Sequence, residues 1–329
     1  MKNSTAPNRK TGRMIAKNLI VLFAVALAGF CGIQAWFTDN RSAEANGIEV
    51  ECQAPDGIEI AVVGHDAPAP TEYTTGNITL NKTNYPFLEK LQLTEITGDG
   101  TFFRKPALIQ SGGQAHVDTK AEWSEPTANE HYLSFDLYIR SKSQYNISIG
   151  KKSTIKPDAP QLTTQDGTGI KNQSKYGNFS RDSVVGAVRF SVVDYKSAPP
   201  SKKLLWLPAP NILLKQTTDE YTLSDDMPSG ESYSHVYYDT NRVQHTVSST
   251  DVDRAFVVNN SGFDGGKFTY ELGKNKSIAE LKKSSDTDTD PYYGAMVTCN
   301  MWIEGEDAEA RLALVNGKFK VNLVLTKKS

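Results

Sequence analysis

The end of the chain alternates apolar with mostly polar residues in the pattern of a β-strand. Between residues 319 and 325, every second position is apolar: Phe319, Val321, Leu323 and Leu325. Because successive side chains of a strand point to opposite faces, this spacing predicts a strand that buries one face. The preceding Asn316-Gly317 is a turn dipeptide whose residues tolerate positive φ. The chain is therefore expected to close on a strand that lies against a core.

Similar short runs occur along most of the chain. In 184–192 the alternation predicts a half-buried strand, with one face formed by Val184, Gly186, Val188, Phe190 and Val192 and the other by Ala187, Arg189 and Ser191. Further strands are expected at 48–52, 58–63, 132–139, 145–149, 254–258, 268–272 and 294–302, with turn residues between them. Many short antiparallel strands predict an all-β body of the β-sandwich or jelly-roll-like kind.

Helix is expected in only three short segments of this body. Asp307 is a candidate N-cap for a helix over 308–314, and a turn or two is expected at 277–283. In 86–93 a helical spacing competes with strand alternation. Long surface loops are expected at 152–175 and 197–203, which are rich in Pro, Gly, Ser, Thr and Lys. One domain over 48–329 is predicted, and two domains divided near residue 200 are the alternative.

A basic head and an oily stretch precede the body. The apolar run 19–33 is about 22 Å long as an N-terminal hydrophobic helix, which suits a signal peptide better than a membrane span. Cleavage by signal peptidase between Ala35 and Trp36 would remove a signal over 1–35 and leave a flexible arm over 36–47. Export by the Sec route to the cell surface or extracellular space follows. The alternative is an uncleaved, single-pass membrane anchor that extends through Phe37.

The residues around the cleavage point resemble a known type of signal. Ala35-Trp36-Phe37-Thr38-Asp39 after a hydrophobic run is similar to the SipW-type signal peptides of TasA- and camelysin-like proteins, which Gram-positive bacteria secrete and build into biofilm matrix fibres. Four later motifs resemble uncharacterised clostridial proteins with the same signal, at residues 97–103, 186–190, 205–208 and 302–307. The body does not obviously align with TasA or camelysin, so the resemblance implies fibre formation through the signal alone.

Charge and cysteine content restrict the partners and the redox chemistry of the exported body. Without the five basic residues of the head, acidic residues outnumber basic ones by seven, so nucleic acid is not expected as a partner. Two cysteines remain beyond the signal, Cys52 and Cys299, and an exported pair can oxidise to one disulfide. Two buried free thiols are the alternative.

Sequence motifs for catalysis are missing, and the chain is predicted not to be an enzyme. It has no His-Glu-x-x-His, no Gly-x-Ser-x-Gly, no phosphate-binding glycine loop and no dinucleotide fingerprint. No two of its five histidines have the i, i+4 spacing that places paired metal ligands on one helix face. No cofactor is expected, and a hydrolase is the third hypothesis for function.

Two acidic clusters are weak candidates for Ca²⁺. One consists of the alternating Asp286, Asp288 and Asp290, and the other includes Glu304 and Glu306. The first departs from an EF-hand loop, because Pro291 stands where the turn glycine belongs. A solvated loop and helix capping explain the two clusters without a metal.

Aromatic residues supply the alternative function. Flat apolar faces that can stack on sugar rings are offered by Trp123, Trp206, Trp302, Tyr237, Tyr238, Tyr292 and Tyr293. Core packing competes with this interpretation. The leading hypothesis is an exported structural protein of the cell surface or matrix, with self-association or other matrix proteins as its contacts, and in one form a fibre subunit that assembles by strand donation. A carbohydrate-binding or adhesive module that recognises glycans is the alternative.

Overall fold

Strands form nearly all of the regular structure in the part of the chain that the computed structural model describes. That part comprises residues 43–44, 49–111, 114–157, 184–208, 214–216, 221–223, 236–246, 253–254, 271–283, 289, 291–305 and 318–328. Its helices are one turn each: the 3-10 helix η2 (Pro86–Leu88) and α2 (Val184–Ala187). The all-β prediction is therefore confirmed. The chain divides into two units, Met1–Arg41 and Ser42–Ser329, and all described residues belong to the second.

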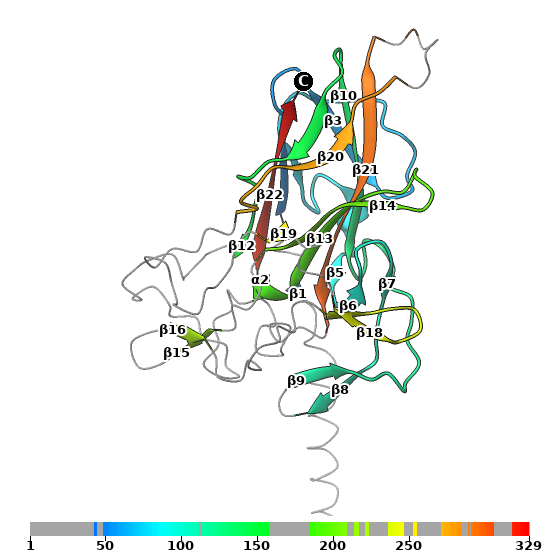
Figure 1. Cartoon of the computed structure of the whole chain (residues 1–329), viewed down its shortest axis with the longest axis vertical. Helices are drawn as coiled ribbons and strands as arrows, with labels where there is room; N and C mark the ends of the chain where they lie inside the picture. Colours follow the sequence, from blue (N-terminus) through cyan, green and yellow to red (C-terminus); the bar gives the residue numbers. More distant parts are fainter. Residues whose placement is uncertain are drawn as a thin grey trace, which may run out of the picture. The chain divides into compact units, whose positions relative to one another are not determined.

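The larger sheet has eight strands (Figure 1). Its main path runs in the order β19 (Asp253–Arg254), β14 (Ser201–Leu207), β13 (Val188–Asp194), β21 (Tyr293–Glu304), β10 (Leu133–Ser141) and β3 (Glu59–Gly64). Off this path, β6 (Glu95–Gly98) pairs with β21 and β7 (Phe103–Arg104) pairs with β6. A domain boundary near residue 200 would separate β13 from β14, which are hydrogen-bonded neighbours.

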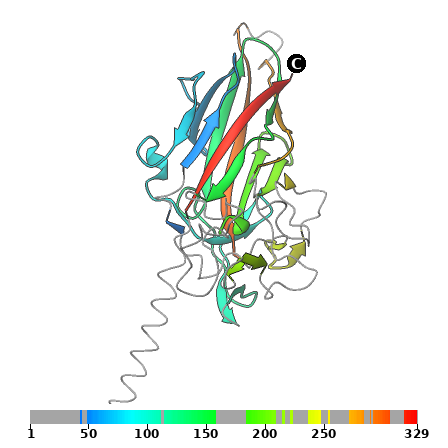
Figure 2. The ribbon, with the colours of Figure 1, turned by 90° about the vertical axis from the view of Figure 1, so that its left-hand side faces the viewer.

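The smaller sheet has six strands and joins the two ends of the body (Figure 2). Its path is β20 (Lys276–Glu280), β11 (Asn146–Ile149), β22 (Phe319–Lys328), β2 (Glu49–Gln53) and β4 (Ile78–Leu80), and β12 (Thr154–Pro157) also pairs with β22. The closing strand β22 buries alternate residues as its sequence predicts. It runs parallel to β2, so not all neighbours are antiparallel as expected.

Four further pairs are two-stranded. They are β1 (Ala43–Glu44) with β5 (Gln92–Leu93), β8 (Leu108–Ser111) with β9 (Gln114–Val117), β15 (Leu214–Gln216) with β16 (Tyr221–Leu223), and β17 (Val236–Tyr238) with β18 (Gln244–Thr246). The ambiguous segment 86–93 contains both expected structures, because it begins with η2 and ends with β5.

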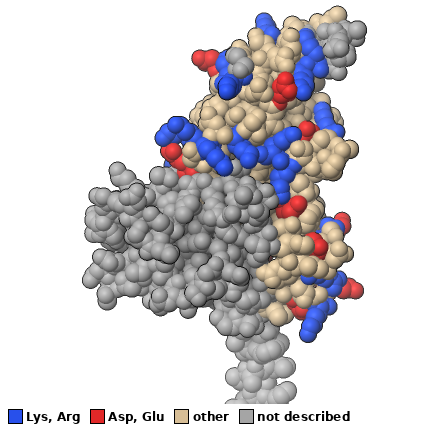
Figure 3. Space-filling model, in the orientation of Figure 1, with Lys and Arg blue, Asp and Glu red and all other residues tan. Residues whose placement is uncertain are grey.

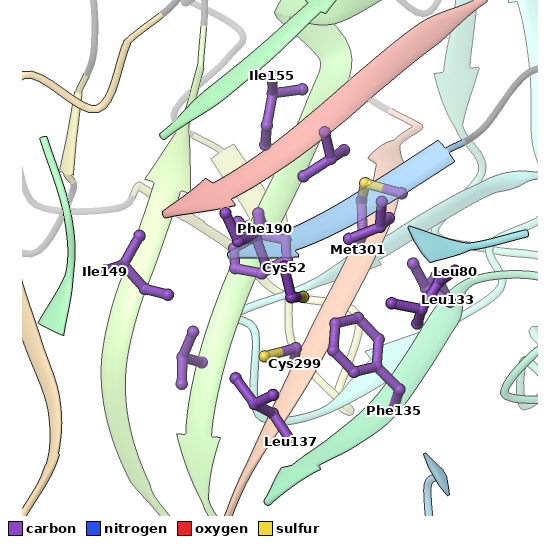
Figure 4. Close-up of a cluster of buried hydrophobic side chains, with 14 of the residues drawn as sticks. Cys52, Leu80, Leu133, Phe135, Leu137, Ile149, Ile155, Phe190, Cys299 and Met301 are labelled. Carbon is purple, nitrogen blue, oxygen red and sulfur yellow. The ribbon is translucent and has the colours of Figure 1, made fainter. Parts of the chain in front are cut away.

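One hydrophobic core takes side chains from both large sheets. Phe135 and Leu137 of β10 and Cys299 of β21 belong to the same buried cluster as Cys52 of β2 and Leu323 of β22. Figure 4 shows Cys52 and Cys299 facing each other in this cluster. Both are free, fully buried thiols, so the structure has the two-thiol alternative rather than the bridge. A bridge between them would join one sheet to the other.

Burial raises the pKa of both cysteine thiols. The pKa of Cys52 rises to about 12, first through loss of solvent and then through the nearby charge of Glu51. The pKa of Cys299 rises well above its ordinary value for the first of these reasons. Since only the thiolate is a good nucleophile, neither thiol is activated for covalent chemistry at neutral pH.

Several local predictions are wrong, because contacts distant in sequence override local patterns. Residues 277–283 do not form a helix: 276–280 are the strand β20, which pairs with β11 and buries Ile278. Residues 184–187 are the helical turn α2, and the strand begins only at Val188. The expected loop 197–203 ends at Ser201, where β14 starts. The expected loop 152–175 contains β12, and its residues 158–175 lie outside the described part.

Other predictions fall wholly or partly outside the described residues. These are the signal 1–35, most of the arm 36–47, the helix 308–314, residues 255–258, and residues 268–270. Within the described residues, no helix has the length and apolar character needed to cross a membrane.

Candidate functional site

The part of the predicted arm that the structure describes is a strand. Ala43 pairs with Leu93 and Glu44 with Gln92, in an antiparallel register that joins β1 to β5. The other side of this segment is already bonded, because the Gln92 amide donates to the Glu130 carbonyl at 2.8 Å. Leu93 is fully buried. The arm strand β1 therefore occupies the remaining backbone edge of β5. A strand from another chain could form the same backbone hydrogen bonds at this edge.

Residues from three of the sequence motifs quoted above, at 97–103, 205–208 and 302–307, contribute to a second, small cluster on the face of the larger sheet that points away from the main core. Residues 97–103 lie over this face. Trp302 packs edge-on against Phe103, with 5.0 Å between ring centroids. Leu205 and Leu207 of β14 and Ile96 of β6 complete this small cluster. Residues 97–103, β14 and β21, which are far apart in the sequence, therefore contact one another here.

The loop within 97–103 is fixed by its own hydrogen bonds. One carboxylate oxygen of Asp99 accepts from the Thr101 amide at 2.7 Å and from the Thr101 hydroxyl at 2.6 Å. The Gly100 carbonyl accepts from the buried Ser191 hydroxyl at 2.8 Å. Lys202 donates to the Asp99 carbonyl at 2.8 Å. These contacts cover a row of polar side chains on the sheet.

That polar row crosses three strands of the larger sheet. Ser134 of β10 donates to the Asn300 amide oxygen at 2.7 Å, and the Asn300 amide nitrogen donates to Ser191 of β13 at 3.4 Å. All three residues are buried. The prediction that β13 is half-buried is therefore wrong, since Arg189 is buried as well. Buried polar groups need partners, and the row with its covering loop supplies them.

A partly buried pair of a histidine and an aspartate lies beside the row, with Asp136 buried and His65 half-buried. Asp136 of β10 accepts from Thr298 of β21 at 2.6 Å and lies 3.0 Å from Nδ1 of His65. Burial raises the pKa of the Asp136 carboxyl, but the hydrogen bonds from His65 and Thr298 outweigh it, and the pKa is lowered overall. The hydrogen bond to Asp136 raises the pKa of His65. Each partner thus favours the charged form of the other.

This arrangement has part of the geometry of a nucleophilic triad. Asp136 holds one nitrogen of His65, as an orienting carboxylate does. The other nitrogen lies 3.6 Å from Asp66, and the ring lies 5.5 Å from the ring of Tyr195. Among the described residues, no serine or threonine hydroxyl is hydrogen-bonded to that second nitrogen. The hydrogen bond between His65 and Asp136 stabilises the charged forms of both side chains.

We expect the His65–Asp136 pair to make stability depend on pH. His65 has its pKa raised above 6.5 in the folded state, so its contribution is complete below that pH and is lost as pH rises through the folded pKa. Asp136 has its pKa lowered below 3.8, so its contribution is lost only in stronger acid. His65→Gln should therefore cost about 1–2 kcal/mol near pH 5.5 and less at pH 8.5.

Urea unfolding of the wild type and of His65→Gln at pH 5.5 and pH 8.5 measures this pH-dependent loss of stability. His131→Gln is the matched control, because the pKa of that histidine is lowered by burial and by Lys105. A loss from His65→Gln that is the same at both pH values would contradict the assignment.

The predicted site residues are scattered or undescribed. Trp206 and Trp302 are fully buried and Tyr238 is nearly so, which leaves them no face for a sugar. Glu304 is buried and accepts from the Trp302 indole at 3.3 Å. Asp286, Asp288, Asp290 and Glu306 lie outside the described residues, within which no cluster of metal-ligating side chains occurs.

The chain was compared with protein-family models, curated proteins and solved structures. None of them matches.

The ion pair could have been suspected from the sequence. Asp136 interrupts a strand between Phe135 and Leu137, which are both fully buried, and a carboxylate in such a run needs a partner. Its partner is 71 positions away, and nothing in the sequence indicates which histidine it is.

Proposed function

We propose that this chain is an exported, non-enzymatic structural protein of the cell surface or extracellular matrix, and that it assembles into fibres by strand donation. Its body is a β-sandwich with long loops, in which two sheets pack face to face around one core. The leader is cut by signal peptidase between Ala35 and Trp36, which frees the arm 36–47. The partners of the arm are other copies of the chain or other matrix proteins. The resemblance of the leader to SipW-type signals supports export and matrix location.

The observation that carries the proposal is the pairing of β1 with β5. The end of the arm already pairs with the one backbone edge of β5 that the contact with Glu130 leaves for another strand. An arm that pairs with its own β5 in one copy can pair with β5 of the next copy with the same register, and such exchange builds open chains. Leu93 is the buried residue of the acceptor strand. In the fibre, Trp36 and Phe37 are the apolar anchors of the donated arm.

We expect deletion of residues 36–45 to abolish fibres seen by electron microscopy. The deletion removes Ala43 and Glu44 and with them the whole of β1. Ala43→Pro is the sharper variant, because it keeps the length of the arm and removes one amide hydrogen from the strand. Ala43→Ser is its matched control and should form fibres like the wild type.

Folding must be kept apart from assembly in this test. Each variant is first checked for a β-type circular dichroism spectrum and cooperative unfolding. Folded variants that still form normal fibres after deletion of 36–45 would contradict strand donation, and so would equal loss of fibres in Ala43→Pro and Ala43→Ser.

A further inference from the structure

A cavity of about 370 Å³ opens at the end of the larger sheet where β10 finishes and β21 begins. Its four cationic lining residues come from three separate stretches of chain: Arg140, Lys196, and the neighbours Lys282 and Lys283. No Asp or Glu is among the described residues that line it. Figure 3 shows Lys and Arg side chains at this end of the described structure. The cavity has the size of a site for one small ligand.

Arg140 is held in place by two tyrosines and a glutamate. Its guanidinium carbon lies 3.8 Å from the ring centroid of Tyr73 and 4.2 Å from that of Tyr292. Its Nε donates to the Glu59 carboxylate at 2.6 Å, and the Tyr292 hydroxyl donates to the same carboxylate at 3.1 Å. A cation stacked on aromatic rings and hydrogen-bonded at Nε has little freedom left.

The fixed guanidinium still has donors to offer. Neither Nη atom of Arg140 donates a hydrogen bond within the described part of the chain. The two Nη groups form a planar fork that matches the two oxygens of a carboxylate. Glu59 therefore positions Arg140 without filling the fork.

The remaining cations add positive charge around the cavity. Lys282 is paired with Glu280 at 2.8 Å. Lys283 lies 5.0 Å above the ring of Tyr293, and neither it nor Lys196 forms an ion pair with a described residue. The body as a whole is acidic, so this local excess of positive charge is not a consequence of composition. It indicates that one anionic group binds at this place, and not that the whole surface attracts anions.

We propose that this pocket binds a uronic-acid unit of an acidic polysaccharide. The sugar carboxylate meets the Nη fork of Arg140, with Lys282 and Lys283 beside it. Tyr138 lines the same cavity and supplies a flat apolar ring and a hydroxyl group, which suit the C–H and O–H groups of a pyranose ring, and the rings of Tyr73 and Tyr292 that hold Arg140 complete the aromatic wall. The pocket involves no residue of the arm or of β5, so this inference stands apart from strand donation.

Calorimetric titration of the full chain with hexagalacturonate tests the proposal. Maltohexaose, which has no carboxylate, and hexaglutamate, which has carboxylates but no sugar, are the comparison ligands. We expect hexagalacturonate to bind at least about tenfold more tightly than either. Equal binding of hexaglutamate, or no binding of hexagalacturonate, would overturn the proposal.

Variants locate the site. Arg140→Gln should weaken hexagalacturonate binding at least about tenfold. The double variant Lys282→Gln/Lys283→Gln keeps Arg140 with its Glu59 partner and tests the pocket if Arg140→Gln fails to fold. Lys90→Gln/Lys120→Gln changes the same number of charges at exposed residues outside the pocket and should bind like wild type. Folded pocket variants that bind like this control would overturn the proposal.

One competitor is within the chain itself. The sequence between Lys283 and Pro291 carries Asp286, Asp288 and Asp290, which lie outside the described residues. A variant with all three changed to Asn separates the two sources of carboxylate. Binding of hexagalacturonate that appears only in this variant would overturn the proposal for the native chain, and binding in both supports it.

Discussion

Replacing Trp302 by alanine is expected to lower the free energy of unfolding by about 3–5 kcal/mol. Trp302 is fully buried on β21, the central strand of the larger sheet. Its ring packs edge-on against Phe103, and its indole donates to the Glu304 carboxylate. The substitution leaves a large cavity under residues 97–103 and removes a partner from a buried carboxylate, and both effects destabilise.

Trp123→Ala is the matched control for this prediction. Trp123 is half-buried, donates to the Asp118 carbonyl at 2.8 Å, and lies edge-on to Tyr238. It therefore has less buried area to lose, and we expect a cost of about 1–2 kcal/mol. Urea unfolding followed by circular dichroism measures both variants. If both variants lose the same unfolding free energy, the packing of residues 97–103 against Trp302 contributes no stability.

The sequence predicted those strands that bury one face and expose the other. In β22 the burial alternates along the strand, which is the pattern that a period of two describes. In β13 the pattern was misleading, because Arg189 and Ser191 are polar and yet buried. Ser191 is covered by residues about 90 positions earlier, among them Gly100, whose carbonyl accepts from the Ser191 hydroxyl. The alternation of polar and apolar residues within one strand does not show which distant residues pack over it.

The segment 277–283 shows the same limit for a helix. Ile278 and Leu281 are three residues apart, as on one face of a helix, and both are buried. Ile278 lies in the strand β20 and Leu281 just beyond its end, because residues 276–280 pair with β11 from far along the chain. A short segment with weak helix and strand propensities adopts the secondary structure that its pairing with a neighbouring strand requires.

The candidate sites were still less predictable. Arg140 and its partner Glu59 are 81 positions apart, and Tyr292 is a further 152 positions away from Arg140. The strand prediction placed Arg140 just beyond the end of one strand and Tyr292 before the start of another. Only the register of β10 against β21 brings these strand ends together. Three tryptophans and four tyrosines were predicted for sugar binding: two of the three tryptophans are core residues, and Tyr292 lines the pocket.

Gly100→Ala is the second substitution with a large expected effect, about 3–4 kcal/mol of lost stability. Gly100 has φ +92°, which L-residues adopt only with strain of about 1–2 kcal/mol. A methyl group there would also lie 2.8 Å from Cβ of the buried Ser191. Ser191 is fixed in the centre of the sheet, so the loop must move away, and overpacking of this kind costs about 1–3 kcal/mol more.

Gly57→Ala separates the two causes. Gly57 also has positive φ, +73°, and its carbonyl also accepts from a serine hydroxyl, that of Ser141 at 2.9 Å. A methyl group at Gly57 meets only the flexible end of Lys327, at 3.5 Å. The backbone strain is therefore similar and the overlap is absent, so we expect a loss of about 1–2 kcal/mol. If Gly57→Ala and Gly100→Ala lower the urea midpoint equally, the close approach of residues 97–103 to β13 contributes nothing, and the cover over the polar row is looser than the structure has it.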